Sequence, residues 1–273
     1  MIYKKYGEVF KSIRKQQGFV ITDFASIGIP KSTLSDFECG RAMMSLAKVD
    51  AALQRMGSGL SQFDNYLNNY ITADTVLLLE EAEQAYFKEN IEKLNELLTT
   101  CEELGYRIIY SSIKVILTEH DDDDVSRIID FLYEAKTWGR TELYIYYIIL
   151  NFLDKDDIID ILQIFKKNSD GICKSKIFNR EIVLALCRAS TILAYRGYKE
   201  ESKQIIKDIE GQGLAEDRMF LRTLLYSTKG VWIYHFENKD EGREKIEFFL
   251  DIQEKIGPPE FSKYFKERYK KYI

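Results

Sequence analysis

The chain has 273 residues, of which 45% are hydrophobic and 30% charged, so it can bury a sizeable core and form two domains. No stretch approaches eighteen consecutive apolar residues, and the first ten residues lack the apolar core of an export signal, which excludes a transmembrane helix and predicts a cytoplasmic protein. The net charge is −5, but residues 1–65 carry nine Lys and Arg against six Asp and Glu, whereas residues 66–273 carry 30 against 38. A basic head on an acidic body predicts different partners for the two parts.

Proline, cysteine and histidine are scarce. No proline occurs from Lys31 to Gly257, and because proline breaks helices this favours a long run of them. The four cysteines form no CxxC pair, and the two histidines are far apart in sequence. We therefore expect no metal or other cofactor, and an enzyme has no visible pairing of a nucleophile with a base.

The head predicts five short helices, because apolar residues recur there at helical spacing between glycines. The second and third helices are short and joined by a tight turn, as in a helix-turn-helix. In that motif the later helix enters the major groove of DNA by its first residues. The five predicted segments are, in order, "KYGEVFKSIRKQQG", "ITDFASIG", "KSTLSDFECG", "SLAKVDAALQRMG" and "LSQFDNYLNNY". In the fourth, Ser45 is the expected cap, and the expected buried stripe consists of Leu46, Val49, Leu53 and Met56.

The third helix carries the candidate DNA contacts. Leu34 and Phe37 are expected to be buried, which leaves its short polar side chains free to reach base edges while nearby cations hold phosphates. A plain five-helix cap with a solvated polar face that binds no DNA is the alternative. The candidates are Lys31, Ser32, Thr33 and Ser35 for base edges or phosphates, and Arg14, Lys15 and Arg41 for phosphates.

From Thr72 onward the chain reads as paired helices joined by short polar turns. Their period is roughly 34–40 residues, which is typical of tetratricopeptide-like hairpins. The predicted pairs are 72–87 with 90–104, 106–119 with 122–136, 140–153 with 155–168, 175–196 with 198–211, and 217–237 with 239–256, and a last helix follows "GPPE". The predicted fold is therefore all-α: a five-helix helix-turn-helix domain over 1–65, a linker over 66–71, and a solenoid with a capping helix over 72–273.

Such helix pairs stack so that their first helices line a concave surface, which is a usual site for an extended peptide. Arg140, Tyr144, Tyr147 and Asn151 fall on one helical stripe. Asn can hold a peptide backbone and Arg a terminal carboxylate. For each residue, a contact between neighbouring repeats is the alternative. Further candidates on the same surface are Asn179, Arg180, Arg188, Arg222 and Tyr226.

Three segments have simpler interpretations. "DDDD" at 121–124 lacks the ligand spacing of a calcium loop, and acidic residues favour the start of a helix. "YIYYIIL" resembles a strand in composition, but its context predicts a helix buried on most sides. The C-terminal "KYFKERYKKYI" mixes aromatic residues with five cations, and a capping helix is the alternative to a nucleic-acid patch.

The motifs "YGEVFKSIRKQQG", "KSTLSDFECG" and "SLAKVDAALQRMG" resemble the N-terminal domain of Rgg/GadR/MutR-type transcriptional regulators of Gram-positive bacteria. Those proteins carry a run close to S-K-S-x-[LI]-S-x-F-E-R-G, followed by a serine-leucine helix. The resemblance implies a homodimeric regulator whose C-terminal repeats sense short peptides. It also favours a capping or dimer helix for "KYFKERYKKYI" over a nucleic-acid patch, because in that family the end of the chain helps to build the dimer. Departures from the usual pattern are Pro30 at the cap, Asp36 and Cys39 in place of common basic residues, and Arg41 in place of glutamate.

The expected function is that of a homodimeric transcription factor without a membrane partner. Its partners would be a double-stranded DNA operator and a short hydrophobic peptide. The alternative is a peptide- or protein-binding helical scaffold whose head has lost specific DNA binding, and Asp36 and Cys39 are its best support. An enzyme built on helical repeats has no site in the sequence to recommend it.

Overall fold

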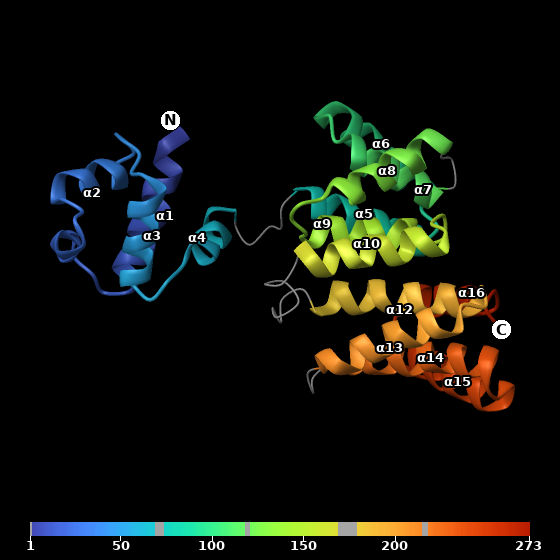
Figure 1. The fold of residues 1–273 in the computed structure, drawn as a ribbon. Coiled ribbons are helices and arrows are strands. Elements are labelled where there is room, and N and C mark those ends of the chain that lie inside the picture. The colour runs from blue at the N-terminus through green and yellow to red at the C-terminus, as the bar shows by residue number, and fades with distance from the viewer. Residues whose placement is uncertain (1, 69–73, 118–120, 169–178, 215–217) are drawn as a thin grey trace. The chain divides into compact units, whose positions relative to one another are not determined.

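The structure is a computed structural model that describes residues 2–68, 74–117, 121–168, 179–214 and 218–273 (Figure 1). Its contacts divide the chain into two compact units, Met1–Ala73 and Asp74–Ile273. We call them the head unit and the repeat unit. All regular secondary structure in the described residues of both units is helical, as the sequence predicts, and these residues contain no strand.

The head unit is held together by a small aromatic core. Phe10 and Phe37 meet edge to face with ring centroids 5.5 Å apart, and both are fully buried together with Phe24 and Leu34. Burial of such rings is a main source of stability in a small domain. The helices of this unit are α1 (Ile2–Gln16), the 3-10 helix η1 (Ile21–Ile27), α2 (Lys31–Glu38), α3 (Leu46–Arg55) and α4 (Leu60–Leu67).

The head differs from the prediction in two details. The second helix is a 3-10 helix, which ends at Gly28 in the left-handed conformation (φ 76°). Leu46, expected on the buried stripe of the fourth helix, is 69% exposed, because it occupies the first position of α3, where the side chain projects past the core. Ser45 does occupy the N-cap position, but its side chain makes no capping hydrogen bond.

Two glycines allow α1 to lie directly against α2. A Cβ atom at Gly7 would lie 2.0 Å from the carbonyl oxygen of Phe37, so any side chain would force the helices apart. At Gly40 the backbone has φ +67°, and a Cβ atom there would lie 2.7 Å from the Cα atom of Lys4. This contact fixes the position of α2 in the head unit.

The described residues of the repeat unit form five helix pairs and a terminal helix. The first helices of successive pairs pack on one another, α5 on α7, α7 on α9, α9 on α12 and α12 on α14. They form an inner layer, as expected of a solenoid. The bounds are α5 (Asp74–Phe87), α6 (Ile91–Leu104), α7 (Arg107–Leu117), α8 (Asp122–Glu134), α9 (Arg140–Ile149), α10 (Lys155–Asn168), α12 (Asn179–Tyr195), α13 (Lys199–Gln212), α14 (Met219–Phe236), α15 (Lys239–Ile256) and α16 (Pro259–Tyr269).

The segment "YIYYIIL" forms a helix, as predicted from its context. It belongs to α9, in which every residue from Leu143 to Ile149 is buried. This helix contacts α5, α7, α8 and α12, so it is buried on most sides. The hydroxyl of Tyr146 donates to the carbonyl oxygen of Ile158, which satisfies a polar group in the core.

The terminal helix α16 packs against both ends of the repeat unit. It contacts α15, its neighbour in sequence, and α5, the first helix of the unit. The rings of Phe87 on α5 and Tyr264 on α16 lie 4.4 Å apart, and Lys263 forms an ion pair with Glu89 at 2.5 Å. Because the first and last helices meet, α16 becomes a wall of the inner surface, which helical periodicity alone does not indicate.

The acidic run "DDDD" begins a helix, as expected. Asp121 caps α8 by accepting a hydrogen bond from the amide of Asp124 at 2.8 Å. Asp124 is 3% exposed and lies 2.5 Å from the Nζ atom of Lys114, while Ser111 donates to it at 2.8 Å. Burial alone would raise the pKa of Asp124, but these donors outweigh it and lower the pKa from 3.8 to about 2.

This depressed pKa predicts an acid-labile contribution to stability. Above pH ~4 the carboxylate should contribute about 2 kcal/mol, and the contribution should disappear as the pH falls from ~4 to ~2, because the unfolded chain then binds the proton more tightly. Urea unfolding of the wild type and of Asp124→Asn between pH 2 and pH 6 measures it. The two free energies should converge at low pH, and a constant difference would contradict the assignment.

In the described ranges, no helix is long and apolar enough to cross a membrane. The same ranges hold no cluster of three or more His, Cys, Asp or Glu side chains arranged to bind a metal ion. Cys173 and His120 lie outside the described residues.

Candidate functional site

The predicted DNA contacts on α2 lie at its accessible beginning. Lys31 and Ser32 are exposed, and Thr33 and Ser35 are partly exposed, whereas Leu34 is buried. Pro30 precedes the helix and provides no side-chain cap, so the amides of the first turn are left for another acceptor. An uncapped first turn of a helix is a favourable place for a phosphate.

Arg14 does not lie on this surface. Its prediction as a phosphate contact is therefore wrong. Its side chain is 7% exposed and forms a two-point ion pair with Glu38, with distances of 2.5 Å from Nε and 2.8 Å from Nη2. Nη1 also donates to the carbonyl oxygen of Phe19 at 2.7 Å. The hydrogen bonds to Glu38, opposed by burial, raise the pKa of Arg14. Arg14 therefore joins α1 to α2, and Lys15, its exposed neighbour, remains a candidate.

Arg41 is exposed but already has a partner. Its Nε and Nη2 atoms each lie 2.8 Å from Oδ1 of Asp36, and the hydrogen bond to Asp36 raises the pKa of Arg41. These two residues are among the departures from the family pattern noted above. The structure pairs them with each other. The positive charge of Arg41, which follows α2, is therefore opposed by the negative charge of Asp36 within α2.

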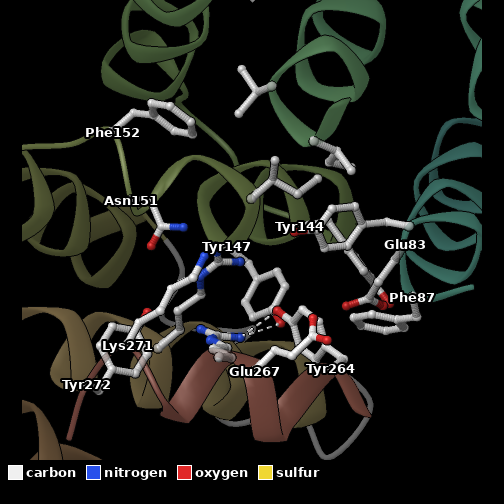
Figure 2. A pocket seen from close by; sticks show the side chains of 16 residues that line it. Glu83, Phe87, Tyr144, Tyr147, Asn151, Phe152, Tyr264, Glu267, Lys271 and Tyr272 are labelled. Carbon is white, nitrogen blue, oxygen red and sulfur yellow. Dashed lines mark hydrogen bonds between the residues drawn. The ribbon is translucent and has the colours of Figure 1, made fainter. Parts of the chain in front are cut away.

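The repeat unit contains a pocket of about 260 Å³ on its inner surface (Figure 2). Side chains from α5, α7, α9 and α12 form one part of it, and α16 closes another side. Its lining of aromatic and aliphatic side chains with a few polar groups is typical of a ligand site. Its lining residues are Glu83, Tyr86, Phe87, Val115, Ile116, Tyr144, Tyr147, Ile148, Asn151, Phe152, Arg188, Tyr264, Glu267, Arg268, Lys271 and Tyr272.

Four of the predicted peptide contacts line this pocket: Tyr144, Tyr147, Asn151 and Arg188. Tyr144 and Tyr147 project from α9, and Asn151 follows its end (Figure 2). Arg188 comes from α12. A fifth candidate, Arg180, does not line the pocket but donates to the Tyr144 hydroxyl at 3.3 Å.

Glu83 is a partly buried carboxylate that lines the pocket. Burial raises its pKa, against the attraction of Arg180 and Arg188, which favour the charged form. The predicted stripe of contacts covers only α9, whereas Glu83 lies on α5. The stripe therefore did not indicate a carboxylate in this wall. It is a residue that sequence reasoning missed.

The remaining candidates lie elsewhere or have other roles. Arg140 pairs with Glu80 at 2.5 Å and with Glu181 at 3.1 Å, so it joins α9 to α5 and α12. Arg222 and Tyr226 lie on α14 beside a different hollow, where Arg222 donates to the carbonyl oxygen of Leu214. The side chain of Asn179 lies outside the described part of the structure.

The C-terminal segment contributes residues that sequence reasoning assigned to a cap. Arg268 donates to the hydroxyls of Tyr264 at 2.8 Å and Tyr147 at 3.2 Å, as the dashed lines in Figure 2 show. Glu267, Lys271 and Tyr272 also line the pocket. The aromatic and cationic composition of this segment was the available signal, but it did not reveal which surface the segment faces.

The architecture defines a class: an N-terminal helix-turn-helix unit followed by helical repeats with a pocket on their inner surface. The family model for the C-terminal domain of the HTH-type transcriptional regulator Rgg matches residues 64–267. This match spans most of the chain, and the chain therefore belongs to the Rgg family, as the motifs of its head predict.

Solved structures with low sequence identity share the fold over nearly the whole chain. The SHP pheromone receptor Rgg2 of Streptococcus dysgalactiae is 19% identical, with a TM-score of 0.74 over 98% of this chain and 100% of that chain. A protein from Listeria monocytogenes EGD-e is 13% identical, with a TM-score of 0.79 over 99% of this chain and 97% of that one. PrgX in complex with cCF10 is 18% identical, with a TM-score of 0.64 over 98% and 92%.

Proposed function

We propose that the protein is a homodimeric transcription factor whose head binds an operator and whose repeat unit senses a short hydrophobic peptide in quorum sensing. Membership of the Rgg family carries this proposal, because the matched model describes helix-turn-helix transcriptional regulators. Two heads in a dimer would contact half-sites about 34 Å apart, one turn of DNA. The similarity in fold to a pheromone receptor supports the sensing role.

The first turn of α2 is the proposed reading surface. Lys31 and Ser32 are exposed there, and Thr33 and Ser35 are partly exposed, next to amides that no side chain caps. Lys15 supplies a further exposed cation on α1. A mobility-shift assay on the promoter beside the gene, over a series of salt concentrations, tests this role. Absence of specific binding at low salt, with and without peptide, would contradict it.

The ion pair between Asp36 and Arg41 yields a prediction about affinity. Asp36→Asn frees Arg41 and removes a negative charge from α2, so the protein should bind the operator more tightly. The dependence of log K on log salt should become steeper by up to about one unit, as for one added phosphate contact. Fluorescence anisotropy at several salt concentrations measures both quantities.

Asp64→Asn is the matched control for this prediction. It removes the same charge from the exposed surface of α4, where Asp64 accepts a hydrogen bond from Asn68. Its effect should be smaller, and its salt dependence should match the wild type. An equal effect of both variants would show that total charge, and not Arg41, sets the affinity.

The pocket is the proposed peptide site, and Tyr144, Tyr147, Asn151 and Arg188 are its proposed contacts. Bound peptide would favour one arrangement of the two heads over another, which requires different affinities for the two states. The experiment is to measure operator affinity with and without a peptide that binds the repeat unit. Equal affinities would contradict the coupling.

A second candidate function is a helical scaffold that binds peptides or proteins but no specific DNA. It is favoured by the neutralised cation at Arg41 and by the burial of Arg14, which leave the head with fewer free cations than its composition indicates. The same mobility-shift assay separates the two functions, because the scaffold would show no specific shift.

A further inference from the structure

Two arginines face the same aromatic ring in the wall of the pocket. The guanidinium carbon of Arg188 lies 4.6 Å from the centroid of the Tyr147 ring, and that of Arg268 lies 5.9 Å from it. One side chain comes from α12 and the other from α16. Two like charges on one ring repel each other unless an anion lies between them.

No carboxylate in the described part of the chain lies within 4.0 Å of either guanidinium. Among the described residues, Arg268 donates only to tyrosine hydroxyls, and the buried Nε atom of Arg188 has no hydrogen-bond partner. Arg14 and Arg140, by contrast, are each paired with carboxylates. Among the described residues, the two pocket arginines therefore lack the carboxylate partners that Arg14 and Arg140 have.

The lining of the pocket is cationic on balance, in a chain whose net charge is −5. Arg188, Arg268 and Lys271 outnumber Glu83 and Glu267 among its charged residues. The pocket therefore suits a ligand with an anionic group.

We propose that Arg188 and Arg268 together bind a carboxylate of the peptide ligand, against the face of Tyr147. The proposal rests on the peptide-sensing function proposed above and specifies its chemistry. Guanidinium groups bind carboxylates through paired, charge-assisted hydrogen bonds. The apolar wall of Phe87, Val115 and Ile148 receives the hydrophobic part of the same ligand.

Three pools of synthetic heptapeptides test the proposal and identify the source of the carboxylate. All three are randomised over Ala, Val, Leu, Ile, Phe, Ser and Asn. The first has free C-terminal carboxylates, the second has C-terminal amides, and the third has C-terminal amides with Asp and Glu added to the mixture. Each pool is incubated with the immobilised full-length protein, and the retained peptides are quantified by mass spectrometry.

Retention of the first pool over the second supports a C-terminal carboxylate, and retention of the third over the second supports an acidic side chain. Equal retention of all three overturns the carboxylate inference but leaves peptide sensing standing. Retention of none overturns both. The most enriched peptide is then titrated calorimetrically against the wild type, Arg188→Met and Arg243→Met.

Arg188→Met should weaken binding of this peptide roughly 10- to 100-fold, the range for a lost hydrogen bond to a charged group. Arg243→Met is the matched control, because Arg243 also lies over a tyrosine ring, that of Tyr234 at 6.0 Å, but does not line the pocket. The melting temperature of Arg188→Met should equal or exceed that of the wild type, since one of two neighbouring cations is removed. A marked fall in melting temperature would assign Arg188 to structure and overturn the proposal.

Discussion

Glu38→Ala is expected to unfold the head unit while leaving the repeat unit folded. The substitution leaves Arg14 buried without its carboxylate, and breaking a buried ion pair from one side costs about 3–5 kcal/mol. A unit of this size has a total stability of only about 4–11 kcal/mol at 0.05–0.15 kcal/mol per residue. Hydrogen exchange measured by mass spectrometry should show lost protection in α1, α2 and α3, with α9 and α14 unchanged.

Two controls separate the ion pair from a general effect of charge. Asp36→Ala breaks the exposed pair with Arg41 and should change protection in the head by at most ~1 kcal/mol. The double variant Arg14→Met with Glu38→Met replaces both charges by apolar side chains and should recover most of the protection. Normal protection in Glu38→Ala would show that the buried pair does not stabilise the head.

Arg140→Met is expected to destabilise the repeat unit by about 3 kcal/mol, because it leaves a buried carboxylate without its cation. The side chain of Glu181 is 6% exposed, and its second oxygen already lacks a hydrogen-bond partner. Urea unfolding followed by tryptophan fluorescence measures the effect, since both tryptophans, Trp138 and Trp232, belong to the repeat unit.

The same measurement distinguishes a structural role of Arg140 from a role in peptide binding. Lys93→Met is the control: it breaks the ion pair with Glu81 at 3.3 Å, in which both side chains are more than a third exposed, and should cost less than ~1 kcal/mol. Arg140→Met with unchanged stability but lost peptide binding would restore the residue to the list of ligand contacts.

Much of the fold could be predicted because helices are local. Apolar spacing, glycine stops and the absence of proline from Lys31 to Gly257 indicated the helix pairs and their approximate bounds. The context of "YIYYIIL" was enough to prefer a helix over a strand, since the surrounding periodicity was helical. The stripe of Tyr144, Tyr147 and Asn151 was also predictable, because residues four and three apart lie on one face of a helix.

The misassigned arginines had partners that are distant in sequence. Arg14 pairs with a residue 24 positions away, and Arg140 with residues 41 and 60 positions away. Periodicity identifies the face of a helix on which a side chain lies, but it does not identify what packs against that face. Both residues were therefore taken for surface cations available to a ligand.

The helical class, the family and the candidate DNA-binding helix of the head could all be predicted from the sequence, because each depends on residues within a few turns of one another. The composition of the pocket depended on the tertiary fold. Tyr147 meets Arg268 across 121 residues, and Lys263 meets Glu89 across 174, because α16 packs on α5. Such contacts result from the stacking of all the repeats between them, which no local pattern records.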